Sequence, residues 1–164
     1  MTRPESDLRR IETVYRSRGA DFLRLALART GDPEQARDAV QEGFAHAIRG
    51  YGSYRGTGSL EAWIARCVIN AAHDAARTGA RHDAARGNGR PLVMEASSDA
   101  GTAIVRESVR RLPQRQRDVL FLRHYLDFDY AAIANTLGIE VGTVSAALHA
   151  ARAALADNLQ EVAR

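Results

Sequence analysis

Apolar residues recur three and four positions apart through most of this chain, and this periodicity restricts the fold more than any other feature of the sequence. It runs over residues 6–78 and resumes after residue 101. Such spacing places apolar side chains on one face of an α-helix, whereas a half-buried strand alternates them at every second position. No stretch of the sequence alternates convincingly in that way. The sequence therefore predicts an all-α protein.

The segment between the two periodic stretches has a different composition. Glycine, proline and serine punctuate residues 79–101, whose only apolar cluster lies at residues 92–94. A stretch of roughly 20 residues without periodicity is too long for an ordinary loop inside a compact domain. We therefore expect two small helical domains, residues 1–79 and 102–164, joined by a flexible linker over residues 80–101.

Capping signals divide the first domain into helices. Asp32 and Pro33 suit the start of a helix over residues 33–49, because aspartate caps a helix and proline fits its first position. Ser59 is a second cap, which predicts a helix over residues 60–78. Four glycines fall among the nine residues 50–58, so a loop is expected between the two helices.

Charge and cysteine content narrow the class of protein. The chain has 164 residues, of which 23 are basic and 20 acidic, so its net charge is only +3. Its one cysteine, Cys67, excludes a disulfide framework and favours a reducing compartment. The sequence shows neither a secretory signal nor a run of about 18 apolar residues. We therefore expect a cytoplasmic protein without membrane insertion.

No catalytic or cofactor site is predicted. The five histidines are scattered along the chain, and Cys67 lies on an apolar helix face. Neither a metal site nor an activated nucleophile assembles from these residues. We therefore expect no metal, no cofactor and no enzymatic activity.

The helix expected over residues 33–49 has two distinct faces. Its apolar face carries Ala36, Val40, Phe44 and Ala47, which we expect to pack inward. The opposite face is polar. Periodicity does not distinguish a solvated face from a surface that docks a partner helix, so both interpretations stay open.

The helix expected over residues 60–78 is apolar on most sides and carries one polar stripe. The stripe consists of Arg66, Asn70, His73 and Arg77, with Trp63 at its upper end. Arginine contacts phosphates and stacks on bases, asparagine pairs with base edges, and tryptophan is a stacking platform. The preceding loop adds Tyr51, Tyr54 and Arg55. Trp63 alone is more simply a core residue, but the whole set favours contact with nucleic acid.

The second domain contains the spacing of a helix-turn-helix. Asp129 caps a short helix over residues 130–137, Gly138 ends that helix, and Thr143 opens the last one. Proline at position 113 separates two helices upstream. The expected core of the motif consists of Ile133, Leu137, Ile139, Val144 and Leu148. Residues 102–123 carry a net charge of +4, which suits phosphate contact.

Both domains resemble the small two-domain bacterial sigma factors of the extracytoplasmic-function (ECF) group in the sigma-70 family. In the first domain the similar strings are LRLAL at 23–27, GD at 31–32, DAVQEGF at 38–44, GSLEAW at 58–63 and IN at 69–70. In the second they are LPQRQRDVL at 112–120, YAAIA at 130–134, LGIEVGTV at 137–144 and LHAARAAL at 148–155. The resemblance covers most of residues 10–160 outside the linker, with a region 2-like domain followed by a region 4-like domain.

The resemblance implies partners and roles. In this family the helix matching residues 33–49 docks on the clamp helices of the largest RNA polymerase subunit, and the next loop and helix capture flipped bases of the −10 promoter element. The second domain reads the −35 element and sits on the polymerase flap, and an anti-sigma partner commonly holds such proteins inactive. The implied residues for core polymerase are Asp38, Gln41, Glu42 and Arg49. Those for −10 DNA are Tyr51, Tyr54, Arg55, Trp63, Arg66, Asn70, His73 and Arg77. Those for −35 DNA are Arg115, Arg117, Thr143, Ser145, Ala146, His149 and Arg152.

The last helix departs from the family pattern. Ser145 stands where a lysine is usual, Ala147 and Ala150 stand where arginines are common, and Asp129 replaces a serine. Residues 124–164 contain two arginines against five acids, a net charge of −3. Because phosphate neutralisation supplies most non-specific affinity, we expect this segment to bind DNA weakly.

Three functions therefore stay open. The first is a sigma factor that binds core polymerase and opens promoters, with weak or unusual −35 recognition. The second is a sigma-like protein-binding module whose C-terminal domain docks an anti-sigma factor or another regulator instead of DNA. The third is a free-standing helix-turn-helix regulator, which would need a dimer interface that the sequence does not reveal.

Overall fold

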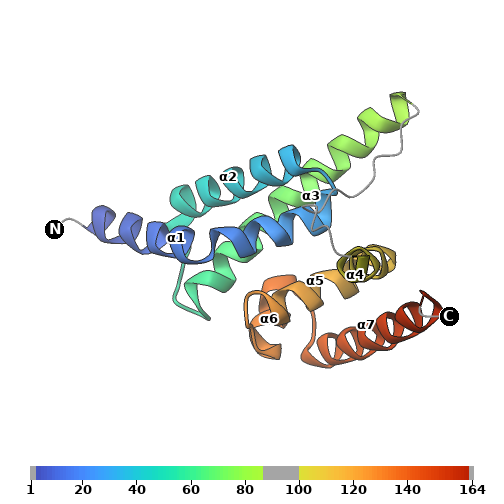
Figure 1. Ribbon diagram of the computed structural model, residues 1–164. Helices are drawn as coiled ribbons and strands as arrows, with labels where there is room; N and C mark the ends of the chain where they lie inside the picture. The colour runs from blue at the N-terminus through green and yellow to red at the C-terminus, as the bar shows by residue number, and fades with distance from the viewer. Residues whose placement is uncertain (1–2, 87–99, 163–164) are drawn as a thin grey trace.

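The computed structural model describes residues 3–86 and 100–162, and within these ranges the chain forms helices and no strand. This confirms the all-α prediction. Figure 1 shows the helices in chain order from blue to red. They are α1 (Arg3–Thr30), α2 (Pro33–Gly50), the 3₁₀ turn η1 (Tyr51–Ser53), α3 (Leu60–Arg86), α4 (Ala100–Arg111), α5 (Gln114–His124), α6 (Tyr130–Leu137) and α7 (Val141–Val162).

Helices α1, α2 and α3 pack together around one apolar core, with Phe22, Ile64 and Val68 fully buried. The predicted inward face of α2 is buried as expected. Gly43 lies at the crossing of α2 and α3, where a Cβ atom would stand 2.6 Å from the Cα of Val68. Only glycine permits this approach, so the two helices pack closer here than larger side chains would allow.

Three predicted helix caps are confirmed by hydrogen bonds. The backbone N–H groups of Gln35, Ala62 and Ala132 donate to the side chains of Asp32, Ser59 and Asp129 at 2.9, 3.1 and 2.7 Å respectively. Gly138 ends α6 in the left-handed conformation with φ 66°, which favours glycine. These local signals position α2, α3 and α6 as the sequence predicts.

Helix α3 extends beyond its predicted end at Thr78, through Gly79, to Arg86. Residues 80–86 are mostly alanine and arginine, whose high helix propensity offsets the cost of about 1 kcal/mol for one glycine. Helix α4 begins at Ala100, so both ends of the predicted linker are helical. The remaining linker residues, 87–99, lie outside the described part of the chain.

Helices α4 to α7 form the second half of the molecule. Val119 and Leu122 of α5 are fully buried together with Ile133, Val144 and Leu148 of the helix-turn-helix. Pro113 separates α4 from α5, as predicted, and is the N-cap residue of α5. One predicted start differs slightly from the structure, because α7 begins two residues earlier than predicted, at Val141.

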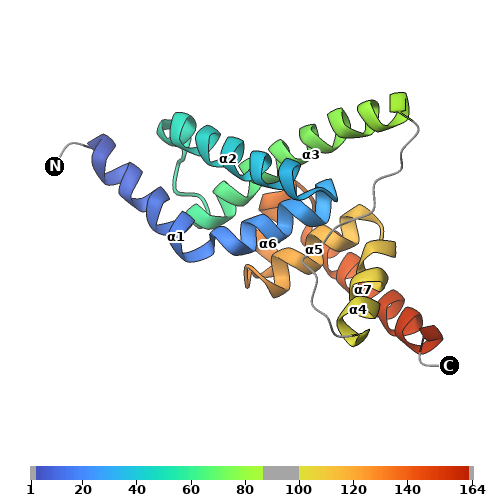
Figure 2. The ribbon, with the colours of Figure 1, turned by 45° about the horizontal axis from the view of Figure 1, so that its top comes forward.

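The two halves pack directly against each other. Helix α1 contacts α5 and α3 contacts α6, so the buried side chains of both halves join one continuous cluster (Figures 1 and 2). An ion pair of 2.6 Å joins Arg29 of α1 to Asp118 of α5. The hydroxyl of Thr136 in α6 lies 3.4 Å from the carbonyl oxygen of Ala62 in α3. We refer to this packing as the closed arrangement.

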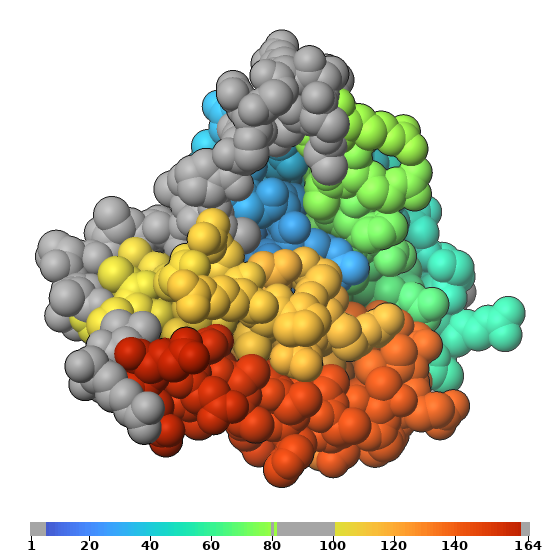
Figure 3. Space-filling model, turned by 90° about the vertical axis from the view of Figure 1, so that its right-hand side faces the viewer, coloured from blue at the N-terminus to red at the C-terminus, as the bar shows by residue number. Residues whose placement is uncertain are grey.

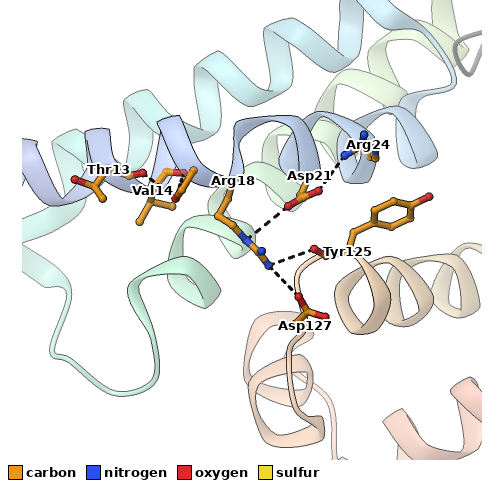
Figure 4. Close-up of polar contacts among 8 residues, drawn as sticks. Thr13, Val14, Arg18, Asp21, Arg24, Tyr125 and Asp127 are labelled. Atoms are coloured by element: carbon orange, nitrogen blue, oxygen red, sulfur yellow. Dashed lines mark hydrogen bonds and ion pairs between the residues drawn. The ribbon is translucent and has the colours of Figure 1, made fainter.

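A second set of contacts joins α1 to the turn after α5 (Figure 4). The Arg18 guanidinium donates to the carbonyl oxygen of Tyr125 at 3.2 Å and lies 3.9 Å from the carboxylate of Asp127. The guanidinium of Arg24 lies 5.4 Å from the centre of the Tyr125 ring. Arginines of α1 therefore hold the second half at two places, Arg29 at one and this pair at the other.

Within the described residues, no single helix combines the length and hydropathy that a bilayer span requires. Helices α6 and α7 reach that threshold only when they are taken together, and the chain bends by 102° between them.

Candidate nucleic-acid interface

The polar face of α2 is exposed, as its periodicity predicts. Asp38, Gln41, Glu42 and Arg49 all lie on this surface. Glu42 accepts a hydrogen bond from Arg49 at 2.9 Å and lies 3.5 Å from the imidazole of His46. The face is therefore a mixed-charge surface, and Asp38 has no ion-pair partner among the described residues.

Tyr51, Tyr54 and Trp63 form one aromatic cluster at the start of α3. The Tyr54 and Trp63 ring centres lie 5.4 Å apart, and Tyr51 stands 5.8 Å from Tyr54 and 6.3 Å from Trp63. All three rings are half-buried and pack against the apolar core. The three rings therefore pack against the core and still present aromatic surface to solvent.

Two features of this loop hold the cluster in place. The Tyr54 hydroxyl donates to the carbonyl of Gly58 at 2.8 Å, and Gly58 has φ 83°, a conformation that favours glycine. The guanidinium of Arg10 in α1 donates to the Tyr51 hydroxyl at 2.8 Å. The contact between Arg10 and Tyr51 was not predicted, because the two residues lie 41 positions apart and no local sequence pattern links them. Arg55 is exposed beside the cluster.

The polar stripe of α3 is exposed along its whole length. Arg66, Asn70, His73 and Arg77 all reach solvent, as do Asp74 and Thr78 beside them, whereas the apolar residues between positions 60 and 76 are buried or half-buried. This is the distribution that the sequence predicts. The stripe begins at Trp63, so the aromatic cluster and the stripe form one surface.

Three stripe residues also line a polar cleft between the two halves. Arg66, Asn70 and His73 face α5 and α6 across a cavity of about 470 Å³, which Arg115 of α5 lines from the other side. Figure 3 looks onto this face, with α3 in green, α5 in gold and the end of α1 in blue between them. The structure therefore brings together residues that the sequence assigned to separate domains.

In the second half, Thr143, Ser145, Ala146 and His149 are exposed along α7. None of these four residues is an arginine or a lysine, so this surface is weakly charged. Arg152 is exposed too, but it lines an apolar groove. Residues 124–164 contain five acids, and all of them are exposed: Asp127, Asp129, Glu140, Asp157 and Glu161.

The structure places Arg117 differently from the other arginines assigned to DNA. Its guanidinium donates to the backbone carbonyl of Arg110 at 3.0 Å and to the side-chain oxygen of Gln114 at 2.8 Å. Burial lowers the pKa of Arg117 from its ordinary value, because desolvation disfavours its charged form. This side chain fixes the junction of α4 and α5, while Arg115 remains exposed.

A groove of about 790 Å³ lies between α1, the start of α2, α4, α5 and α7. Leu23, Val109 and Leu155 supply apolar lining. The lining contains no carboxylate, and its arginine and histidine residues are Arg24, Arg37, Arg106, His124 and Arg152.

The described residues hold no group of three or more histidine, cysteine, aspartate or glutamate side chains that could bind a metal. Cys67 is half-buried in α3, and burial raises the pKa of its thiol above the ordinary value. A raised pKa disfavours the reactive thiolate.

An exposed surface of arginine, asparagine and aromatic side chains on α3, together with a helix-turn-helix, is typical of an all-α nucleic-acid-binding protein. Comparison with known families makes this class specific. The family model "Sigma-70 region 2" matches residues 14–82. The model "Sigma-70, region 4" matches residues 102–155.

Curated relatives agree with the family models. The chain is 32% identical over 146 residues to the ECF RNA polymerase sigma factor SigM of Mycobacterium tuberculosis, covering 88% of this chain and 74% of the relative. It is 25% identical over 158 residues to the RNA polymerase sigma factor YlaC of Bacillus subtilis, covering 91% of each. The chain belongs to the ECF RNA polymerase sigma factors of the sigma-70 family.

Solved structures share the fold. The sigma factor RpoE of Bartonella quintana, crystallised with the anti-sigma factor NepR, aligns with a TM-score of 0.77 at 20% identity, covering 91% of this chain and 95% of that one. CnrH, solved with the cytosolic domain of CnrY, aligns with a TM-score of 0.71 at 21% identity, covering 96% and 92%. Both alignments span the two halves together.

Proposed function

We propose that this protein binds core RNA polymerase and directs it to promoters, where it contributes to recognition and opening of the duplex. The observation that carries the proposal is the exposed stripe of α3 beside the aromatic cluster, in a chain that matches sigma-70 region 2 and region 4. Stacking and base-edge contacts of these residue types suit unpaired bases. The protein would act in the cytoplasm and contribute no catalytic residue of its own.

The two halves divide this work. Residues 1–79 dock on the polymerase clamp through Asp38, Gln41, Glu42 and Arg49, and hold the −10 element with the α3 surface. Residues 80–101 connect the halves. Residues 102–164 meet the −35 element and the polymerase flap, and Arg115 with the exposed residues of α7 contacts DNA. The few positive charges of α7 support weak −35 binding, so −10 contacts supply most of the promoter affinity.

Run-off transcription tests the role of the stripe. With core polymerase and a pool of genomic fragments, the wild-type protein is expected to initiate at a cognate promoter. Asn70→Ala should lower promoter opening about tenfold, because a lost base-edge contact costs about 1–3 kcal/mol, while binding to core polymerase is unchanged. Asn135→Ala, an exposed asparagine of α6 outside the assigned surfaces, is the matched control. Equal transcription by both variants would remove Asn70 from the −10 surface.

Charge reversal tests the docking face of α2. Asp38→Arg combined with Glu42→Arg should abolish capture of core polymerase in a pull-down, because both exposed carboxylates lie on the proposed contact and like charges repel across an interface. The control combines Glu34→Arg with Asp74→Arg, which changes the net charge equally at two other exposed sites of this half. Normal affinity of the Asp38 and Glu42 variant would contradict the assignment.

The apolar groove between α1, α4, α5 and α7 favours a second activity, the docking of a regulatory protein such as an anti-sigma factor. The arginines of its lining suit an amphipathic segment with acidic residues. The same run-off experiment separates the two activities. If reconstituted polymerase binds the protein and no promoter is ever opened, the protein-binding module is favoured over the sigma factor.

A further inference from the structure

The polar cleft between the halves exists only in the closed arrangement. Helices α1 and α3 supply one wall, and α5 and α6 supply the other. Neither half would form this site alone. A ligand in the cleft would therefore contact both halves at once.

The charges of the cleft are not balanced. Three arginines line it, Arg29, Arg66 and Arg115, against the single carboxylate of Asp118. One oxygen of Asp118 accepts a hydrogen bond from Arg29 at 2.6 Å and the other accepts from Gln114 at 2.8 Å. Arg66 and Arg115 form no ion pair with any residue that the structure describes. The lining thus carries two arginines without a counter-charge.

Arg29 adds an unused donor to the same region. Its Nε–H group is buried and has no hydrogen-bond acceptor among the described residues. Asn70 and His73, both exposed on the α3 wall, add side chains that hydrogen-bond to oxygen. The site has donors and positive charge in excess of acceptors and negative charge.

We propose that this cleft binds a small phosphorylated anion carrying a diphosphate or triphosphate group. Guanidinium groups recognise phosphate oxygens by paired, charge-assisted hydrogen bonds. The volume of about 470 Å³ lies within the range of small-ligand sites. Duplex DNA does not fit between walls that belong to the two packed halves, so the occupant is a small molecule.

Binding at this cleft would stabilise the closed arrangement, because a ligand that contacts both halves favours the state in which they meet. It would also occupy Arg66, Asn70 and His73. The bound anion would therefore compete with promoter DNA for these residues, and this consequence rests on the proposed function. Binding of the anion itself does not depend on it.

Isothermal titration of the full chain with inorganic pyrophosphate tests the proposal without polymerase or DNA. We expect saturable binding that weakens at least about tenfold in Arg66→Gln and in Arg115→Gln. Arg9→Gln removes an exposed arginine of α1 that does not line the cleft and has no described ion-pair partner, and it should bind like the wild type. Sodium sulfate at equal ionic strength controls for general screening.

Three outcomes would overturn the proposal: no saturable binding, equal weakening in Arg9→Gln, or unchanged binding in both cleft variants. Circular dichroism of each variant identifies a loss of fold. A short single-stranded DNA serves as the competing ligand; if it saturates the same arginines and pyrophosphate does not, they serve DNA alone and the small-anion site is wrong. A protein that binds pyrophosphate but fails in run-off transcription would disprove the proposed function and leave the anion site intact.

Discussion

Gly43 shows how much of this fold can depend on one missing side chain. Sequence reasoning places position 43 in a helix that begins at Pro33, and in that setting a glycine is only a cost of helix propensity. The structure gives it a role, because α2 and α3 meet at Gly43 with the backbone of Val68 directly opposite. Periodicity reports which face of a helix turns inward, and it does not report how closely the partner helix approaches.

Gly43→Ala is therefore expected to destabilise the protein by about 1–3 kcal/mol, since the new methyl group must push the two helices apart. The measurement is the urea midpoint of unfolding followed by circular dichroism. Gly142→Ala is the matched control, because Gly142 is also helical and a Cβ there meets nothing within 4 Å. That control should stabilise the protein by about 0.5–1 kcal/mol. Equal stability of Gly43→Ala and the wild type would show that the helix crossing relaxes without cost.

Asp118 marks the limit of prediction at the residue scale. In the sequence it is one acid in a segment rich in arginine, where a solvated position is the simplest expectation. The structure buries its carboxylate against Arg29, which lies 89 positions earlier. No periodic or capping signal connects residues so far apart. Local rules therefore predicted the exposed stripe of α3 and missed the contacts between the two halves.

At the scale of elements, the sequence correctly predicted the helix ends that depend on residues within one helix turn. The caps of α2, α3 and α6 and the glycine that ends α6 are all where the residue types require. The predicted end of α3 at Thr78 was wrong, because residues 80–86 are good helix formers that continue the helix after an isolated glycine. One isolated glycine, Gly79, is thus too weak a signal to end α3.

Helix α6 begins with a cap that also carries charge. Asp129 is exposed at the start of the helix-turn-helix and accepts from the N–H of Ala132. Asp129→Ser should keep the cap and remove a charge that repels phosphate, raising the affinity of holoenzyme for promoter DNA about two- to fivefold at low salt. Fluorescence anisotropy at two salt concentrations measures this, and the gain should shrink as salt rises.

The control is Asp129→Ala, which removes the charge and the cap together. It should lower the free energy of unfolding by about 0.5–2 kcal/mol, a loss that Asp129→Ser largely avoids. If Asp129→Ser left the DNA affinity unchanged at both salt concentrations, the start of α6 would lie away from the phosphates. Position 129 would then have only its capping role.

At the scale of the molecule, the closed arrangement conflicts with simultaneous contact to both promoter elements. The −10 and −35 elements are centred about 25 base pairs apart, roughly 85 Å along duplex DNA. Yet Asn70, assigned to the first, and Arg115, assigned to the second, line the same cleft. If both assignments hold, the halves must separate before the chain engages a promoter through both. The contacts between the halves then set the free-energy cost of separating the halves before promoter binding.

The ion pair of Arg29 and Asp118 is the contact to test, because it is the shortest and most buried ion pair between the halves. Asp118→Asn keeps the shape of the side chain and removes its charge. Losing a charge-assisted hydrogen bond worth about 1.5–3 kcal/mol should raise the open population at least about tenfold. Resonance energy transfer between dyes on exposed positions of α2 and α7 measures the distance between the halves in the free protein. Glu107→Gln is the matched control, since Glu107 also pairs with arginine, through Arg110 and Arg111, but all three residues lie within α4. If the distance increases in Asp118→Asn and not in Glu107→Gln, the Arg29–Asp118 ion pair holds the halves together. If the distance is the same in both variants, the apolar contacts between the halves have that role.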